Sequence, residues 1–279
     1  MIDHAVLLKA AQDLAPLPAA VVRLAALVAK GTYSADEVEA IVRLDAPLTL
    51  RLLQYANSAA SASHIRIGTV REAVMRVGVG PILSYATAST LRPLLVRAIP
   101  AYGLSEGDLW RHSVAAALAS EVIAQKARVD VPPESFTASL LHDIGKLTLS
   151  RFLDADYLQW LAAAREQGGE SNLRAEIEIL GVHHGELGGL IGSHWNLPPR
   201  VVRGITYHHA PAAGFDVICD VTHVANVLAT RAGTGYAAAP SELEADPEAL
   251  ERLGLVPARL AALEDTVKER LARALEQFK

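Results

Sequence analysis

Apolar residues recur at the spacing of an α-helix along almost the whole chain, and this pattern restricts the fold more than any other feature. The alternating apolar and polar residues of a half-buried β-strand are absent. Capping boxes at 34–37 and 69–72 predict two helix starts. Between them, a helix that follows Asp45 has one apolar face, made of Leu48, Leu52, Leu53 and Ala56. The sequence therefore predicts an all-α, bundle-like fold with short connections.

The segment 100–107 is rich in Pro, Gly and Ser and marks the clearest internal boundary. We predict two lobes and a tail: an N-terminal helical lobe over 1–103, a helical core over 104–236, and a C-terminal extension over 237–279 that packs on the core. Before the boundary, helices are expected at 19–30, 34–44, from 45, at 69–78 and at 81–97. After it, they are expected at 106–127, 133–149, 154–167, 172–180, 184–194, 198–208, 216–230, 247–253 and 257–277.

The composition is that of a folded, acidic chain. Hydrophobic residues make up 51% and charged residues 20%, which excludes an intrinsically disordered protein. The net charge of −5 predicts no nucleic-acid partner, and we interpret the arginines at 43, 51, 66, 71 and 76 as a solvated face. The single Cys219 excludes an internal disulfide and a cysteine-rich zinc site. Because no signal peptide and no run of about 20 apolar residues is present, we expect a cytoplasmic protein without a membrane partner.

Eight of the ten histidines follow the boundary, mostly in clusters. The clusters are His112, the pair His142–Asp143, the pair His183–His184 and the pair His208–His209. Side chains from facing helices can converge on one ion, and imidazoles with a carboxylate suit zinc, iron, manganese or nickel. Neighbours on a helix point about 100° apart, so His142 and Asp143 would hold one ion from two sides or bridge two. Lys146 follows one turn later and could meet a phosphate.

The same residues also have a purely structural interpretation. A single helical histidine is more often hydrogen-bonded within the protein than bound to a metal, and we assign His4 and His64 to that class. A pair such as His208–His209 stabilises the C-terminal dipole of its helix without any metal. The spacing is looser than that of a zinc finger. The residues alone therefore leave both interpretations open.

Several segments resemble the HDOD family, the HD-related output domains of bacterial signalling proteins. The longest is 41–58, which reads IVRLDAPLTLRLLQYANS. The others lie around it in family order: LP at 17–18, TVREA at 69–73 with G at 78, LW at 109–110 with HS at 112–113, LLHDIGK at 140–146, E at 176 with LG at 180–181, HGELG at 184–188, WNLP at 195–198, YHH at 207–209 and AN at 225–226. The resemblance covers about residues 7–230 and implies two helical lobes, the second similar to the core of HD phosphohydrolases.

The resemblance also implies a metal site. His112, His142 and Asp143 match ligands of the H…HD…D pattern of the HD superfamily. Lys146 matches the lysine that follows this pattern. The phosphodiesterase branch of the superfamily holds further metals at positions that match His184, His208 and His209.

Two departures from the pattern predict that this site is degenerate. Asn226 stands where the pattern ends in aspartate, and an amide oxygen can bind a hard cation but adds no charge. The Gly-Tyr-Pro loop of the phosphodiesterase branch is missing, because Ala210 and Pro211 follow His209 directly. We therefore expect either a divalent transition metal (Fe, Mn, Zn or Ni) or no metal.

The resemblance implies two functions. The first is a signal-transduction protein that acts by binding a signalling protein partner or a nucleotide-like ligand. The alternative is a metal-dependent phosphohydrolase for a nucleotide or another phosphoester, with His184 or His208 moving protons and Lys146 neutralising phosphate charge. The amphipathic tail 257–277 could form a homodimer instead of packing back. The missing aspartate and loop favour the first function.

Overall fold

The computed structural model describes residues 4–43, 45–57, 67–153, 172–235 and 239–277. These residues form helices and turns, with one isolated antiparallel bridge between Ile99 and Leu104, so the all-α prediction is confirmed. The α-helices are α1 His4–Gln12, α2 Ala19–Ala29, α3 Ala35–Val42, α4 Ala46–Ala56, α5 Val70–Val77, α6 Val79–Leu95, α7 Asp108–Ala124, α8 Ser135–Leu141, α9 Gly145–Leu149, α11 Asn172–Leu180, α12 His184–His194, α13 Pro199–Tyr207, α14 Val217–Arg231, α15 Pro247–Leu253 and α16 Leu260–Gln277. The short 3-10 helices are η2 Pro100–Tyr102, η3 Ser150–Phe152, η4 Pro211–Gly214, η5 Pro240–Leu243 and η6 Pro257–Arg259.

Side-chain caps start the first helices where the sequence predicts them. Ser34 Oγ accepts a hydrogen bond from the Glu37 amide (3.2 Å), and the Glu37 carboxylate accepts one from the Ser34 amide (2.8 Å). Thr69 and Glu72 form the same reciprocal pair at α5. These bonds satisfy amides that a helix N-terminus leaves unpaired, and both predicted capping boxes are confirmed.

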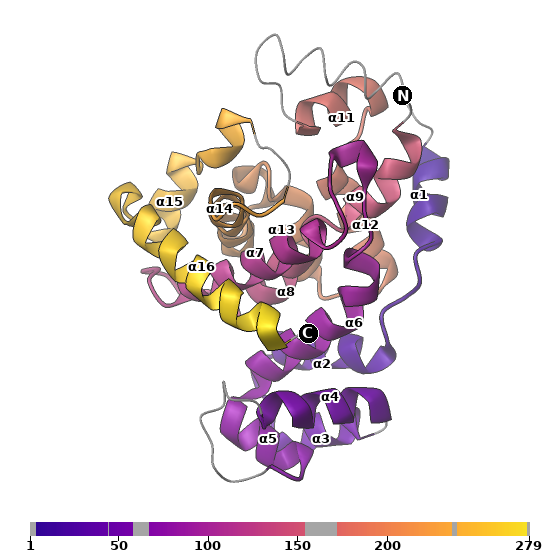
Figure 1. Ribbon diagram of the computed structural model, residues 1–279, viewed down its shortest axis with the longest axis vertical. Coiled ribbons are helices and arrows are strands. Elements are labelled where there is room, and N and C mark those ends of the chain that lie inside the picture. The colour runs from indigo at the N-terminus through magenta and orange to yellow at the C-terminus, as the bar shows by residue number, and fades with distance from the viewer. Residues whose placement is uncertain (1–3, 44, 58–66, 154–171, 236–238, 278–279) are drawn as a thin grey trace.

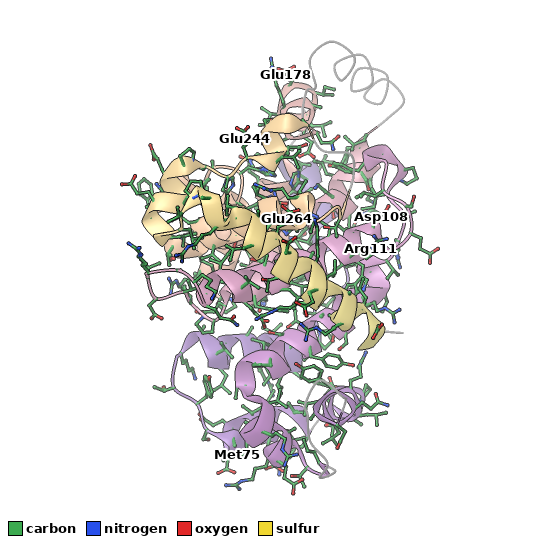
Figure 2. The ribbon with its side chains drawn as sticks, turned by 60° about the vertical axis from the view of Figure 1, so that its left-hand side comes forward. Met75, Asp108, Arg111, Glu178, Glu244 and Glu264 are labelled. Atoms are coloured by element: carbon green, nitrogen blue, oxygen red, sulfur yellow. The ribbon has the colours of Figure 1, made fainter. Side chains whose placement is uncertain are left out.

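Helices α3, α4 and α5 form a small unit at one end of the molecule, with α2 and α6 lying over it (Figure 1). One hydrophobic cluster fills this unit and includes Val38, Leu52, Val74 and Ile82. Met75 lies at the tip of this end with 76% of its surface exposed (Figure 2). The small unit therefore has a core of its own.

Helix α7 runs through the larger unit and packs against α8, α14 and α16. Helix α1 is first in the chain, yet it contacts α12 and buries Leu7 and Ala11 in this larger core (Figure 1). The tail helix α16 buries Leu263, Val267 and Leu271 in the same core. In the described part of the chain, no helix combines the length and the apolar character needed to cross a bilayer.

One predicted helix is wrong. Segment 133–149 is broken: α8 ends at Leu141, a turn follows, and α9 begins at Gly145. His142 Nδ1 donates to the Ser139 carbonyl (2.7 Å) and the Ile144 amide to the Leu141 carbonyl (2.9 Å), which tightens the chain beyond an α-helical turn. The HD pair therefore lies at a junction between two short helices. The predicted helix 154–167 lies outside the described residues.

Candidate metal centre

The turn at residues 142–144, which we call the HD turn, lies against the start of α12 through a close backbone contact. Gly145 lies so near α12 that a Cβ atom there would overlap the carbonyl oxygen of His184 and lie 2.8 Å from the Gly188 amide nitrogen. Only glycine lets two backbones approach in this way. As a result, Asp143 Oδ1 lies 3.1 Å from His184 Nε2.

His112, His142, Asp143 and Asn226 form what we call the first group. His112 Nε2 lies 3.2 Å from His142 Nε2 and 3.0 Å from Asn226 Oδ1. Asp143 Oδ2 lies 3.6 Å and 3.5 Å from the same two ring nitrogens. Three parts of the fold, namely α7, the HD turn and α14, thus bring four ligand-type side chains together. His112, His142 and Asp143 are all buried.

Hydrogen bonds determine which ring nitrogen of each histidine carries its hydrogen. His142 Nδ1 faces the Ser139 carbonyl, which can only accept, so the hydrogen is on Nδ1. His112 Nδ1 lies 3.2 Å from Thr234 Oγ1, and that hydroxyl already donates to the Ala229 carbonyl (2.7 Å). The Thr234 hydroxyl therefore accepts a hydrogen bond from His112 Nδ1, and the hydrogen of His112 is on Nδ1.

These two tautomers leave a bare lone pair on each Nε2 atom. Two Nε2 lone pairs and the Asn226 oxygen then converge, with no hydrogen between the atoms that face one another. These lone pairs repel one another, and a cation bound among them would replace the repulsion with coordination. Metal-bound histidines normally donate their second ring nitrogen to an oxygen, as His112 and His142 do here.

His184, His208 and His209 form the second group. His184 Nε2 lies 2.9 Å from His209 Nε2. His208 Nδ1 donates to the Ile205 carbonyl (2.7 Å), while His208 Nε2 is buried and has no hydrogen-bond partner among the described residues. The candidate ligand atoms of each group's three histidine or aspartate residues lie within 4.8 Å of one another. An unpaired buried ring nitrogen and this spacing fit a metal ligand set.

Asp143, a member of the first group, also contacts the second group. Its Oδ2 atom faces His112 and His142, and its Oδ1 atom faces His184. One carboxylate therefore contacts both groups. That the HD pair holds one ion from two sides or bridges two stays a prediction, and the pair stands on a turn and not within a helix.

Glu176 on α11 is part of this centre, although the sequence analysis did not assign it a role there. Its buried carboxylate accepts from His184 Nδ1 (2.8 Å), from the His184 amide (2.7 Å) and from the Tyr102 hydroxyl (2.8 Å). These bonds place the His184 hydrogen on Nδ1 and leave Nε2 to face the site. The bond to Tyr102 joins residues 74 positions apart along the chain, so no local pattern in the sequence indicates it.

Lys146 forms a buried ion pair inside the centre. Its Nζ atom lies 2.6 Å from Asp143 Oδ2, and only 2% and 3% of the two side chains is exposed. The lysine that we expected to meet a phosphate thus holds the carboxylate of the site. Its positive charge offsets the single negative charge that the first group contributes.

Burial favours the neutral form of four of the five candidate ligand histidines. It lowers the pKa of His112 to about 3, although Asp143 acts in the opposite direction. Burial also lowers the pKa of His142, and it brings the pKa values of His208 and His209 well below their usual range. Neutral imidazole is the form that binds a metal.

The charged residues of the centre behave differently. Burial lowers the pKa of His184, but the carboxylate of Glu176 outweighs it, so the net pKa is raised. Burial raises the pKa of Asp143, but the Lys146 cation beside it outweighs this effect, and the net pKa lies well below the usual value. Asp143 is therefore ionised at neutral pH, as a carboxylate ligand must be.

The remaining described histidines lie outside the two groups. His183 caps α12 by accepting from the Gly185 amide (3.1 Å). His223 donates from Nδ1 to the His208 carbonyl (2.8 Å) and accepts at Nε2 from the Asp246 amide (2.9 Å), so both nitrogens are used within the protein. His194 is exposed at the end of α12, and His64 lies outside the described residues. All seven predicted metal-binding residues, by contrast, fall within the two groups.

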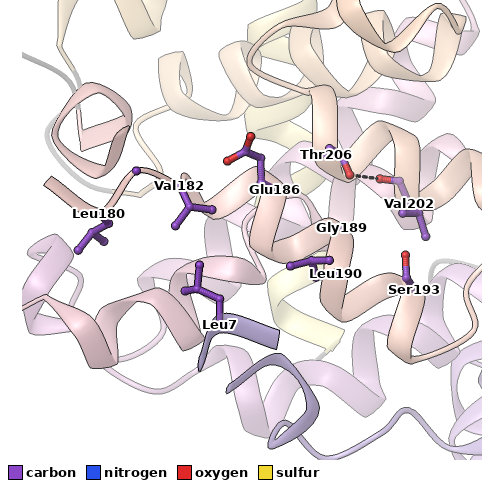
Figure 3. Close-up of a pocket in the computed structure, with 10 residues that line it drawn as sticks. Leu7, Leu180, Val182, Glu186, Gly189, Leu190, Ser193, Val202 and Thr206 are labelled. Carbon is purple, nitrogen blue, oxygen red and sulfur yellow. Dashed lines mark hydrogen bonds between the residues drawn. The ribbon is translucent and has the colours of Figure 1, made fainter. Parts of the chain in front are cut away.

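A separate cavity of about 490 Å³ lies between α1, α12 and α13 (Figure 3). Its walls are mainly apolar and include Leu7, Leu190 and Val202. Thr206 Oγ1 points toward Val202, whose carbonyl accepts its hydrogen bond (2.9 Å). No residue of either histidine group lines this cavity, so it is distinct from the candidate metal centre.

Solved structures share this fold across nearly the whole chain. An HDOD domain protein with unknown function from Geobacter sulfurreducens is 22% identical, with 98% of both chains covered and a TM-score of 0.76. A candidate signal transduction protein from Marinobacter aquaeolei VT8 is 20% identical, with 96% of this chain and 60% of that chain covered and a TM-score of 0.74. A candidate phosphohydrolase from Shewanella amazonensis SB2B is 24% identical, with 98% and 95% covered and a TM-score of 0.65.

A curated relative and a family profile complete the comparison. An uncharacterized protein of Treponema pallidum (strain Nichols) is 24% identical over 204 residues, which cover 71% of this chain and 38% of the relative. The chain therefore spans well under half the length of that relative. The HDOD domain profile matches residues 14–211, which include every predicted ligand except Asn226. This match extends over more than half of the sequence, and the chain belongs to the HDOD domain family.

Proposed function

We propose that this chain is a regulatory signal-transduction module that binds a divalent transition metal at the two histidine groups and responds to a partner protein or a small phosphorylated ligand. The facing Nε2 atoms of His112 and His142, 3.2 Å apart with their hydrogens on the far sides, carry the metal part of this proposal. Membership of a family of signalling output domains supports the regulatory part.

The donor set favours a transition metal over magnesium or calcium. Five imidazoles face the centre, while one carboxylate and one amide oxygen supply the hard ligands. Imidazole suits zinc, iron, manganese and nickel, whereas magnesium and calcium take mainly oxygen ligands. When bound, such an ion would polarise an anionic ligand and lower the pKa of a bound water molecule.

The charge balance favours binding over turnover. Asp143 is the only carboxylate in the two groups, and the ion pair with Lys146 offsets its charge. Glu176 adds one negative charge behind His184 but does not face the candidate ligand atoms. Asn226 adds an oxygen but no charge. Two divalent ions would therefore carry a large excess of positive charge, which a phosphorylated ligand would balance by staying bound.

A metal analysis tests this proposal. We expect about one ion or more per chain in protein purified without chelator. In His142→Ala we expect the metal affinity to be at least about tenfold lower, since even the loss of a supporting residue costs 10–100-fold in affinity. His194→Ala removes an exposed histidine and should leave the metal content unchanged. Asn226→Asp should raise metal affinity, a gain that misfolding cannot produce. Metal-free wild-type protein that takes up none of Mn²⁺, Fe²⁺, Ni²⁺ or Zn²⁺ would disprove the proposal.

A metal-dependent phosphohydrolase is the second candidate function. It is favoured by the second group and by Asp143, which contacts both groups as a ligand shared by two ions would. In this reaction His208, whose Nε2 atom has no partner among the described residues, or His184 would move a proton, and Lys146 would hold Asp143 in place.

Turnover distinguishes the two functions. We expect wild-type protein loaded with each of the four metals to release no more p-nitrophenol from bis(p-nitrophenyl) phosphate than Asp143→Asn does. A nucleotide panel should give the same result. Metal-dependent turnover that is lost in Asp143→Asn and kept in His194→Ala would establish the second function and replace the first.

A further inference from the structure

A cleft of about 340 Å³ lies where the end of α7 meets α15 and α16. Helices α15 and α16 lie at one side of the molecule (Figure 1), where α15 packs against α14 and α16 packs against α7. Two parts of the chain supply the walls: the segment just after α7 and the segment from the end of α15 into α16. The lining residues are Lys126, Arg128, Gly254, Leu255, Val256, Arg259, Ala262 and Leu263. We call this hollow the basic cleft.

Three cations and no carboxylate line the basic cleft. Lys126, Arg128 and Arg259 are exposed, and none of them forms an ion pair or a side-chain hydrogen bond with another described residue. Their neighbours are paired: Arg252 with Asp220 (2.8 Å) and Arg270 with Glu121 (3.7 Å). Like charges around a hollow repel one another, so an anion in the cleft would be stabilised. This local excess of positive charge is notable in a chain whose net charge is −5.

The backbone holds Arg128 in place before any ligand binds. The Arg128 amide donates to the Leu253 carbonyl (2.9 Å). Gly254 has a φ of +65°, and a Cβ atom there would lie 2.7 Å from the Arg128 Cβ and 2.9 Å from its Cγ and Cδ. The stem of Arg128 therefore lies directly on the Gly254 backbone. A side chain that is already held loses less entropy on binding.

The cleft also has an apolar wall. Leu255 and Leu263 are buried beneath it, and Val256 is 47% exposed at its side. A bare inorganic anion would use the cations but leave this wall in water. A ligand with both a phosphate group and an aromatic ring would use both surfaces. Its phosphate would contact the cations and its ring would pack on the apolar wall, where a guanidinium group can also stack on the ring. The volume lies at the lower end of the range for small-molecule sites.

We propose that the basic cleft binds a phosphorylated small molecule with an aromatic ring, of the class of the nucleoside diphosphates. The site is distinct from the metal centre, because His112 stands near the start of α7 and Lys126 lies just past its end, about 20 Å away along the helix. A ligand in the basic cleft would contact both α16 and the segment that follows α7, the helix that carries His112. Binding at the basic cleft does not depend on the proposed metal function.

Calorimetric titration of chelator-treated protein with ADP tests the proposal. We expect saturable binding that weakens as ionic strength rises. Arg128→Gln and Arg259→Gln should each weaken it about tenfold, since each removes one charge-assisted contact. Arg43→Gln removes an exposed arginine from the small unit and should change nothing. Adenosine and inorganic pyrophosphate should each bind at least about tenfold more weakly than ADP.

Four results would overturn the proposal. The first is no binding of ADP to the full chain, and the second is ADP binding that Arg128→Gln and Arg259→Gln leave unchanged. The third is adenosine or pyrophosphate binding as tightly as ADP, because the cleft would then not recognise both parts of the ligand. The fourth is ADP binding that disappears in His142→Ala, which would place ADP at the metal centre. All three cations are exposed, so their substitution should not affect folding, and a melting curve of each variant checks this.

Discussion

Gly145→Ala is expected to lower the melting temperature by about 5 °C, which corresponds to about 3 kcal/mol for a chain of this size. The added methyl group would overlap the carbonyl oxygen of His184 and crowd the Gly188 amide. Both are backbone atoms at the start of α12, so no side chain can rotate away to make room. Helices α9 and α12 would have to separate, and this would also draw His184 away from Asp143.

Differential scanning calorimetry of the two proteins measures this effect. Gly80→Ala is a matched control: Gly80 lies in α6, and a Cβ atom there meets nothing within 4 Å. That substitution should raise stability slightly, because alanine favours a helix over glycine by roughly 0.5–1 kcal/mol. If Gly145→Ala melts within about 2 °C of the wild type, the close contact between α9 and α12 does not exist as described.

Acidification from pH 7 to pH 5 is expected to destabilise chelator-treated protein by several kcal/mol. Burial lowers the pKa of His112 to about 3, whereas the unfolded chain titrates this group near 6.5. Below pH 6.5 the unfolded state therefore binds more protons than the folded state, and stability falls with pH. His112 alone accounts for about 2 kcal/mol over this interval. Burial also lowers the pKa values of His142, His208 and His209, which act in the same direction.

His184 has the opposite sign. Its pKa is raised, so its contribution is complete below pH 6.5 and is lost as the pH rises through its folded-state pKa. One such group does not outweigh four buried histidines with lowered pKa values. The net stability should therefore fall on the acid side of neutrality.

Urea unfolding at a series of pH values tests this prediction. His112→Gln should reduce the loss between pH 7 and pH 5 by about 2 kcal/mol, because it removes one titrating group. His194→Gln removes an exposed histidine and should leave the profile unchanged. Equal stability of wild-type protein at pH 7 and pH 5 would show that these histidines are not buried in their neutral form.

Helix positions followed mainly from local signals. The capping boxes at Ser34 and Thr69 and the apolar face of α4 depend on residues a few positions apart, and these are as predicted. The break between α8 and α9 could not be seen in the same way. It coincides with the close contact of Gly145 with α12, which lies about 40 residues further along the chain.

The candidate site shows the same division. The histidine pairs and the HD pair stand out because they combine metal-binding residue types within one or two positions. Glu176 matches the family only as a position without a role, and Thr234 does not stand out, since a single carboxylate or hydroxyl on a helix or loop is common. Their roles come from hydrogen bonds to His184 and to His112, the latter 122 residues before Thr234. Lys146 was recognised by position, but its buried ion pair with Asp143 was not predicted, although their spacing of three residues allows it.

The sequence by itself determined the all-α class, the family and the residues that can bind a metal, because helical periodicity, caps and motif residues are local properties. The tertiary structure alone decided which of these residues meet. It brought α7, the HD turn, α12, α13 and α14 together so that Asp143 contacts both histidine groups, and it chose the tautomers through Ser139, Thr234 and Glu176. It also placed three cations around the basic cleft. Such convergence depends on long-range packing, and residues far apart in the chain become neighbours only when the core is buried.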